Sequence, residues 1–450
     1  MNAFNENLNE QQAQQPMGCL HRFSKTIKVV IIGLLILLLM IPMFMIENLI
    51  SERGRTQEEA IDEVSEKWSL AQTITGPYLN LQYPVVTENN GEKKVSIKDL
   101  ILFPDELMVN GQLKTEILKR SIYEVNVYQS ELTLKGSFSS EELKKSRIDM
   151  DQLQFDRAAI CLNLTDMRGI SEQISITLGD SVYIFEPGMD NRGIANTGVH
   201  AIANLSELKQ NKKLPYEIKI KLKGSQSLNF IPLGKTTRVD LKANWNTPSF
   251  TGNYLPNNRN ITEKEFSAQW QVLNLNRNYS QVMVDFNTSN IKDIESSSFG
   301  VNFKIPVEQY QQSMRSAKYA ILIILLTFGV IFFTEIMNKT RIHALQYLLV
   351  GLALCLFYSL LLSFSEHVGF NPAYLLSSAL TIILVGGYMF GITKKKKPSL
   401  IMSGLLGILY LYIFVLIQLE TFALLAGSLG LFIILAIVMY FSKKIDWFNE

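Results

Sequence analysis

The residue types that bind metals or perform nucleophilic chemistry are scarce in this chain. It has four histidines and three cysteines in 450 residues. None of them falls in an HExxH or CxxC pattern, the spacings that bring zinc ligands together. The serines form no G-x-S-x-G nucleophile elbow, and no P-loop or G-x-G-x-x-G phosphate-binding loop occurs. The sequence therefore predicts no catalytic residues, no metal site and no cofactor, and we expect the protein not to be an enzyme.

A group of ionisable residues lies close to predicted membrane segments. Glu366, His367 and Glu420 fall in two short loops between apolar runs, and Glu335 lies near the end of another run. Ionisable groups at membrane depth are often functional. Two interpretations stay open. These residues anchor helices at the interface, or Glu366, His367 and Glu420 converge beneath an exported domain, pair with its Arg or Lys residues and couple it to the membrane helices.

The elements that position these residues are six hydrophobic runs. A helix needs about 20 apolar residues to cross the hydrocarbon core of a bilayer, and only the fifth run is marginal in length. The runs cover residues 27–46, 318–337, 344–363, 373–392, 400–416 and 422–441. No small-x-small cleavage pattern follows the first run, so we expect it to be an uncleaved signal anchor.

Basic residues favour one orientation of these spans, because Lys and Arg in short loops stay on the cytoplasmic side of the membrane. They precede the first span and follow the second, fourth and sixth, whereas the loops 364–372 and 418–421 contain none. Both termini are then cytoplasmic. The predicted parts are a cytoplasmic tail at 1–26, an exported domain at 47–317, a five-helix bundle at 318–441 and a cytoplasmic tail at 442–450.

The exported domain begins with a helical pattern and continues with strands. Apolar residues at helical spacing predict a helical stalk at 51–75. From Tyr78 onward the period is two in several segments, among them residues 238–241, which is typical of half-buried strands. We therefore expect a large, mainly β domain of sandwich type, in one or two subdomains with a break within 140–156. Two similar strings, LTLKGS at 132–137 and IKLKGS at 220–225, are a weak indication of internal duplication.

Charge restricts the partners. The net charge of +2 gives no basic footprint for nucleic acid. The one dense basic run, the four lysines at 394–397, is interpreted as a topology anchor rather than a binding patch. The lipid bilayer is the partner that the six spans require.

Several long strings are similar to one known family. In the membrane part they are MRSAKYA (314–320), QYLLVGLAL (346–354), FYSLLLS (357–363), SEHVGFNPAY (365–374) and QLETFALLAGS (418–428). In the exported part they are QTITGP (72–77), IYEV (122–125), WNTPSFTGNYLP (245–256), Trp270 and the pair Asn276 and Arg277. Over nearly the whole chain after about residue 30, the sequence resembles the CreD family of inner-membrane proteins.

The resemblance implies a multi-pass protein of the inner (cytoplasmic) membrane of Gram-negative bacteria, with residues of about 47–317 in the periplasm. It also implies a role in cell envelope integrity and stress response, without an established enzymatic activity. In some members expression is linked to a CreBC-type two-component system.

We therefore expect a protein that supports envelope integrity by binding a periplasmic or inner-membrane protein partner. Two alternatives stay open. A transporter or lipid-handling protein would use the five-helix bundle and would need a polar cavity that reaches the middle of the bilayer. An envelope-stress sensor would need a cytoplasmic partner to pass its signal on.

Overall fold

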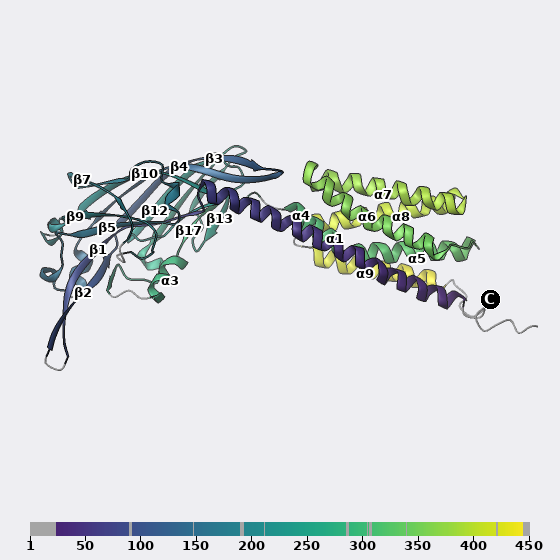
Figure 1. Ribbon diagram of the computed structural model, residues 1–450, viewed down its shortest axis with the longest axis horizontal. Helices are drawn as coiled ribbons and strands as arrows, with labels where there is room; N and C mark the ends of the chain where they lie inside the picture. Colours follow the sequence, from purple (N-terminus) through teal and green to yellow (C-terminus); the bar gives the residue numbers. More distant parts are fainter. Residues whose placement is uncertain are drawn as a thin grey trace, which may run out of the picture. The chain divides into compact units, whose positions relative to one another are not determined.

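The structure is a computed structural model, and it describes residues 24–89, 92–146, 148–189, 193–210, 212–284, 288–303, 305, 308–338, 340–419 and 422–443. The chain divides into two compact units, Met1–Thr56 with Val307–Glu450, and Gln57–Pro306. We call the first the membrane unit and the second the β unit, and many of their elements are labelled in Figure 1.

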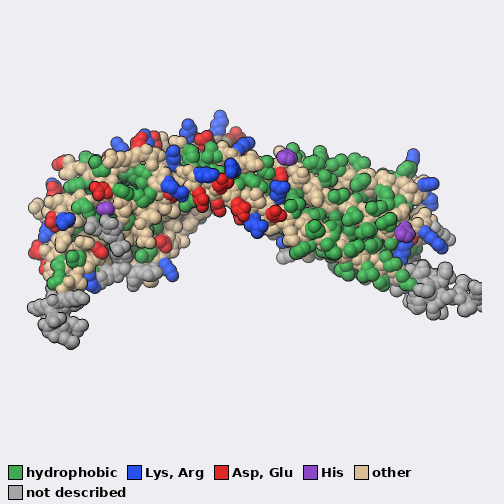
Figure 2. All heavy atoms as spheres, in the orientation of Figure 1, with side chains coloured by type: hydrophobic (Ala, Val, Ile, Leu, Met, Phe, Trp, Pro, Cys, Tyr) green, Lys and Arg blue, Asp and Glu red, His purple; other side chains and the backbone are tan. Residues whose placement is uncertain are grey.

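The membrane unit is built of helices. It contains α1 (Ser24–Trp68) as far as Thr56, α4 (Glu308–Lys318), α5 (Ala320–Asn338), α6 (Ala344–Val368), α7 (Phe370–Thr393), α8 (Lys396–Gln418) and α9 (Ala423–Ser442). Among the described residues, α1 and α5 to α8 are long and apolar enough to cross a membrane, and α9 contains a shorter apolar stretch, Leu425–Tyr440. Hydrophobic side chains make up much of the visible surface of this unit, and charged side chains lie at its ends (Figure 2). The predicted class, a helical membrane protein with a large β domain, is confirmed.

The turn between α6 and α7 is shorter than the loop predicted at 364–372. α6 continues to Val368 and α7 begins at Phe370, so Gly369 alone joins the two helices. Gly369 has a φ of 79°, which glycine adopts without the steric cost that a side chain would add. Glu366 and His367 therefore lie in the last turn of α6 and not in a loop.

Small and aromatic residues decide how the membrane helices pack. A Cβ atom at Gly351 of α6 would overlap the side chain of Leu39, so the glycine lets α1 approach α6 closely. Between α6, α7 and α8, the ring centroid of Phe357 lies 4.5 Å from that of Tyr410 and 5.4 Å from that of Tyr374. The first span is thus packed on the later helices at this point.

Two sheets make up the β unit. Within the described residues, the nine-stranded sheet contains β1 (Gln72–Asn89), β2 (Glu92–Leu102), β5 (Ala158–Leu164), β8 (Glu186–Pro187), β9 (Val199–Ala203), β11 (Ser227–Phe230), β13 (Ser249–Gly252), β16 (Val282–Val284) and β17 (Phe299–Asn302). The eight-stranded sheet, again counted over described residues, has the order β14 (Asn258–Ile261), β15 (Phe266–Leu273), β12 (Thr236–Ala243), β3 (Glu106–Arg120), β4 (Tyr123–Phe138), β10 (Leu214–Ser225), β6 (Ser175–Leu178) and β7 (Ser181–Ile184).

Both sheets contribute to one hydrophobic core. Strand β12 shows how the sequence produces it, because side chains alternate between the two faces of a strand. Val239 and Leu241 are buried in the core, and Arg238, Asp240 and Lys242 alternate with them on the other face. The alternation that predicted a strand at 238–241 thus also fixes which side chains meet solvent.

The two similar strings lie in neighbouring strands that pair antiparallel, β4 and β10. Gly136 of β4 lies opposite Tyr216 of β10, and Gly224 of β10 lies opposite Tyr128 of β4. A Cβ atom at either glycine would overlap the tyrosine opposite. The glycine in each string therefore leaves room for the tyrosine on the opposite strand. This shared packing requirement explains why the two strings are similar.

Two details of the β unit differ from the predictions. The stalk helix predicted at 51–75 ends at Trp68, and β1 begins at Gln72, since the β-branched run Thr73 to Thr75 favours a strand. The segment 140–156, where a break would lie if the domain had two subdomains, contains α2 (Glu141–Lys145) and connects β4 to β5 inside a single compact unit.

Candidate functional site

Glu335 is buried near the end of α5, where its carboxylate joins three elements of the membrane unit. It forms an ion pair with Lys28 of α1. The backbone N–H of Ile342 donates to Oε1 over 3.1 Å, and the Tyr347 hydroxyl of α6 donates to Oε2 over 3.1 Å. Lys28 also donates to the Ile342 carbonyl over 3.0 Å. Both carboxylate oxygens are therefore partnered, and the group ties α1 to α5 and α6.

Glu366 makes a second connection to α1, on the last turn of α6. The Tyr310 hydroxyl of α4 donates to its Oε1 over 3.0 Å, and Nε of Arg53 lies 3.7 Å from the same oxygen. Arg53 falls within the segment 47–317 that the sequence assigned to the exported domain, but it belongs to the membrane unit. The carboxylate thus pairs with an arginine of α1.

The sequence predicted that two further residues, His367 and Glu420, would meet Glu366. His367 is exposed on the last turn of α6. Glu420 lies outside the described residues, so the predicted meeting of Glu366, His367 and Glu420 stays a prediction. Within the part of the chain that the structure describes, no group of three or more His, Cys, Asp and Glu side chains is placed to hold a metal ion.

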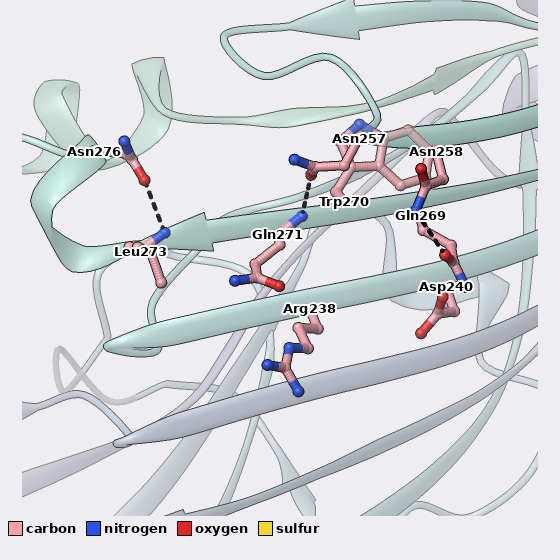
Figure 3. Close-up of a pocket in the computed structure, with 9 residues that line it drawn as sticks. All are labelled: Arg238, Asp240, Asn257, Asn258, Gln269, Trp270, Gln271, Leu273 and Asn276. Atoms are coloured by element: carbon pink, nitrogen blue, oxygen red, sulfur yellow. Dashed lines mark hydrogen bonds between the residues drawn. The ribbon is translucent and has the colours of Figure 1, made fainter.

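A polar groove on the β unit brings together residues that the sequence did not single out as a site (Figure 3). Its volume is about 490 Å³, within the range of about 300–1,000 Å³ that is typical of ligand sites. It lies on β12, β15 and the start of β14. The lining residues are Arg238, Asp240, Asn257, Asn258, Gln269, Trp270, Gln271, Leu273 and Asn276.

Hydrogen bonds to the backbone of β15 orient two carboxamides of the groove. The backbone N–H of Gln271 donates to Oδ1 of Asn257 over 2.7 Å, and the N–H of Leu273 donates to Oδ1 of Asn276 over 3.0 Å (Figure 3). The amide nitrogen of each asparagine is thereby fixed in position, because the oxygen and nitrogen share one plane.

One buried and several half-buried side chains next to the groove hold its rim in place. Nε1 of Trp270 donates to the Tyr254 carbonyl over 3.2 Å, and the Tyr254 hydroxyl donates to the Asn276 carbonyl over 2.7 Å. The adjacent guanidinium of Arg277 stacks on Tyr279, 4.2 Å from the ring centroid. Burial lowers the pKa of Arg277 and raises the pKa of Tyr279 to about 12. The groove is therefore built on a packed base, and these contacts hold its rim without a ligand.

The sequence contained only a partial signal for this groove. Trp270 and Asn276 occur in the strings that carry the family resemblance, and the alternation at 238–241 predicted that Arg238 and Asp240 would share a face. The remaining residues come from the start of β14 and from β15, and their proximity depends on strand pairing that the sequence did not specify.

The two units together define a class: a multi-pass helical membrane protein with one large, mainly β domain. The family model described as "Inner membrane protein CreD" matches residues 24–448. The chain therefore belongs to the CreD family and is an inner-membrane protein. It is similar to Inner membrane protein CreD of Escherichia coli (strain K12), with 32% identity over 420 residues that cover 92% of this chain and 91% of that protein.

Proposed function

We propose that this protein is a membrane-anchored binding protein that supports the integrity of the cell envelope. In this proposal both termini are cytoplasmic, the segment of about 47–317 is periplasmic, and the β unit binds a periplasmic or inner-membrane partner without catalysing a reaction. The distribution of Lys and Arg among the short loops supports the orientation. Membership of the CreD family supports a place of action at the inner membrane.

The observation that carries the proposal is the polar groove on β12, β15 and β14. It has the volume of a ligand site, and within the described residues the side chains of Arg238, Asp240 and Gln271 make no hydrogen bond in it, although Asn258 and Gln269 are bonded to each other. Among the described residues, neither Arg238 nor Asp240 forms an ion pair, although both line the groove. Polar groups that converge without internal partners are typical of a surface that binds another molecule.

Complementation of a deletion strain tests this function. Cells that lack the protein are challenged with a β-lactam and with detergent, and they carry the wild type, Arg238→Ala with Gln271→Ala, or Lys242→Ala. Lys242 is a matched control, because it lies on the same strand and face as Arg238 but does not line the groove. All variants are compared at equal abundance in the membrane.

We expect the wild type and Lys242→Ala to restore survival and the double groove variant to fail. Full rescue by the double variant would contradict a role for the groove. Failure of Lys242→Ala to the same extent would mean that general changes to this face, and not the groove, reduce survival.

A further inference from the structure

The groove has an unusual set of lining residues, dominated by carboxamides. Five of its nine lining residues are Asn or Gln, and the two charged residues, Arg238 and Asp240, have opposite signs. The groove therefore has no net formal charge. A ligand with strong net charge would gain nothing overall from these side chains, whereas a ligand rich in neutral hydrogen-bonding groups would find many partners.

Carboxamides offer donors and acceptors side by side. The oxygens of Asn257 and Asn276 already accept backbone N–H groups, so each of these residues offers its amide nitrogen as a donor. Within the described residues, the side chain of Gln271 forms no hydrogen bond and offers both an oxygen and a nitrogen. Hydroxyl groups of sugars both donate and accept, so they can use all of these positions.

Apolar anchors, which dominate protein partners, are few in the groove. Protein interfaces depend on a small number of aromatic or aliphatic side chains that fill apolar pockets. Of the two apolar residues in the lining, Trp270 is 2% exposed and Leu273 is 39% exposed. One exposed leucine can lie against the C–H face of a sugar ring, but it does not provide the apolar centre that a protein segment needs.

The groove is also open along the sheet and borders an edge strand. β14 is the last strand of its sheet, and all four of its residues are exposed. A chain longer than the groove can therefore extend past it. From the neutral charge, the carboxamide lining and the open edge, we infer that the groove binds an uncharged oligosaccharide, with the amides hydrogen-bonded to its hydroxyl and acylamino groups.

This inference rests on the proposed function in that it assigns the ligand of the same groove. It is tested with the full chain reconstituted in lipid nanodiscs, because detergents with a maltoside headgroup would compete for the site. The probes are a hexamer of N-acetylglucosamine, a hexamer of β-1,4-linked glucose, and an uncharged hexapeptide rich in Ser and Gln. Binding is measured by isothermal titration calorimetry for the wild type, Gln271→Ala, Arg238→Ala and Lys242→Ala.

We expect at least one oligosaccharide to bind, and we expect each groove variant to weaken that binding by about tenfold, the equivalent of one or two lost hydrogen bonds. Lys242→Ala should bind as the wild type does. A thermal unfolding scan of each variant separates lost contacts from a misfolded β unit.

Several results would overturn the inference. They are binding of the peptide without either sugar, sugar binding that the groove variants leave unchanged, and no binding of any probe by a folded wild type. If no sugar binds while the groove variants still fail in the complementation experiment, the ligand class is wrong and the proposed function stands. If a sugar binds in the groove and the variants complement fully, the inference stands and the proposed function fails.

Discussion

The ion pair of Lys28 and Glu335 in the membrane unit is stable only in suitable surroundings. Removing two charges from water costs several kcal/mol for each ion, and the cost is offset only when the geometry and the additional hydrogen bonds are good. Ile342 and Tyr347 supply such bonds to Glu335. The side chain of Glu335 is 10% exposed and that of Lys28 is 29% exposed, so the lysine is only partly buried. Each of the two charges therefore depends on the other to offset its desolvation cost.

We expect Glu335→Ala to destabilise the membrane unit by about 1–3 kcal/mol, because it leaves Lys28 without its counter-ion. Replacing both residues, with Lys28→Met and Glu335→Met, should recover a large part of this loss. Thermal unfolding of the purified protein in detergent measures both effects. Lys395→Met serves as the control for loss of a lysine at the surface. A single Glu335→Ala variant as stable as the wild type would show that the pair contributes nothing.

At the scale of elements, Asp166 organises the connection between α1 and β1. It accepts the backbone N–H of Leu70 over 2.9 Å and pairs with Arg168 over 2.9 Å. Arg168 in turn donates to the carbonyl of Glu66 near the end of α1 over 2.7 Å. Burial on its own would raise the pKa of Asp166, but the hydrogen bonds from Arg168 and from the backbone outweigh it and hold the pKa below its ordinary value.

The lowered pKa of Asp166 predicts a loss of stability in acid. Its contribution is complete above the unfolded-state pKa of about 3.9 and is lost as the pH falls through the lower folded-state pKa. Asp166→Asn should cost about 1–3 kcal/mol at neutral pH, and it should reduce the acid dependence. Unfolding of the purified protein between about pH 2 and pH 7 tests this. The exposed Asp180→Asn is the control, and an unchanged acid dependence in Asp166→Asn would contradict the assignment.

Elements were predictable from the sequence where one physical requirement acts on many consecutive residues. Helices that cross a bilayer must be apolar over about 20 positions, and strands beside a core must alternate, so both appear as periodic patterns. Neither requirement reveals which distant residues meet. Glu335 stood out as an ionisable residue, but its partner Lys28 is 307 residues away. The groove combines β12, β15 and β14, and its Asn and Gln residues are individually ordinary in loops and on strand surfaces.

At the scale of the whole molecule, the orientation in the membrane decides what the β unit can meet. Val182 lies on β7 and is 64% exposed, and Lys395 lies between α7 and α8. These two positions belong to different units. They are therefore suited to report the two sides of the membrane independently.

We expect a membrane-impermeant maleimide to label Val182→Cys in intact spheroplasts and Lys395→Cys only after lysis. Both variants are made in a background in which Cys19, Cys161 and Cys355 are replaced by serine, and the unlabelled background is the control. The expected result follows from retention of the basic loops on the cytoplasmic side. Labelling of Lys395→Cys alone in intact spheroplasts would invert the proposed topology.

The separation of 307 residues between Lys28 and Glu335 also has a consequence in time. Synthesis at about 5–20 residues per second places roughly 15–60 s between the two residues leaving the ribosome. If α1 enters the membrane as it is made, Lys28 lacks its counter-ion during this interval, and its ammonium must stay close to the lipid headgroups. The later arrival of α5 then supplies the counter-ion, and α6 adds the Tyr347 hydroxyl. The ion pair that links α1 to α5 can therefore form only after the entire β unit has been synthesised.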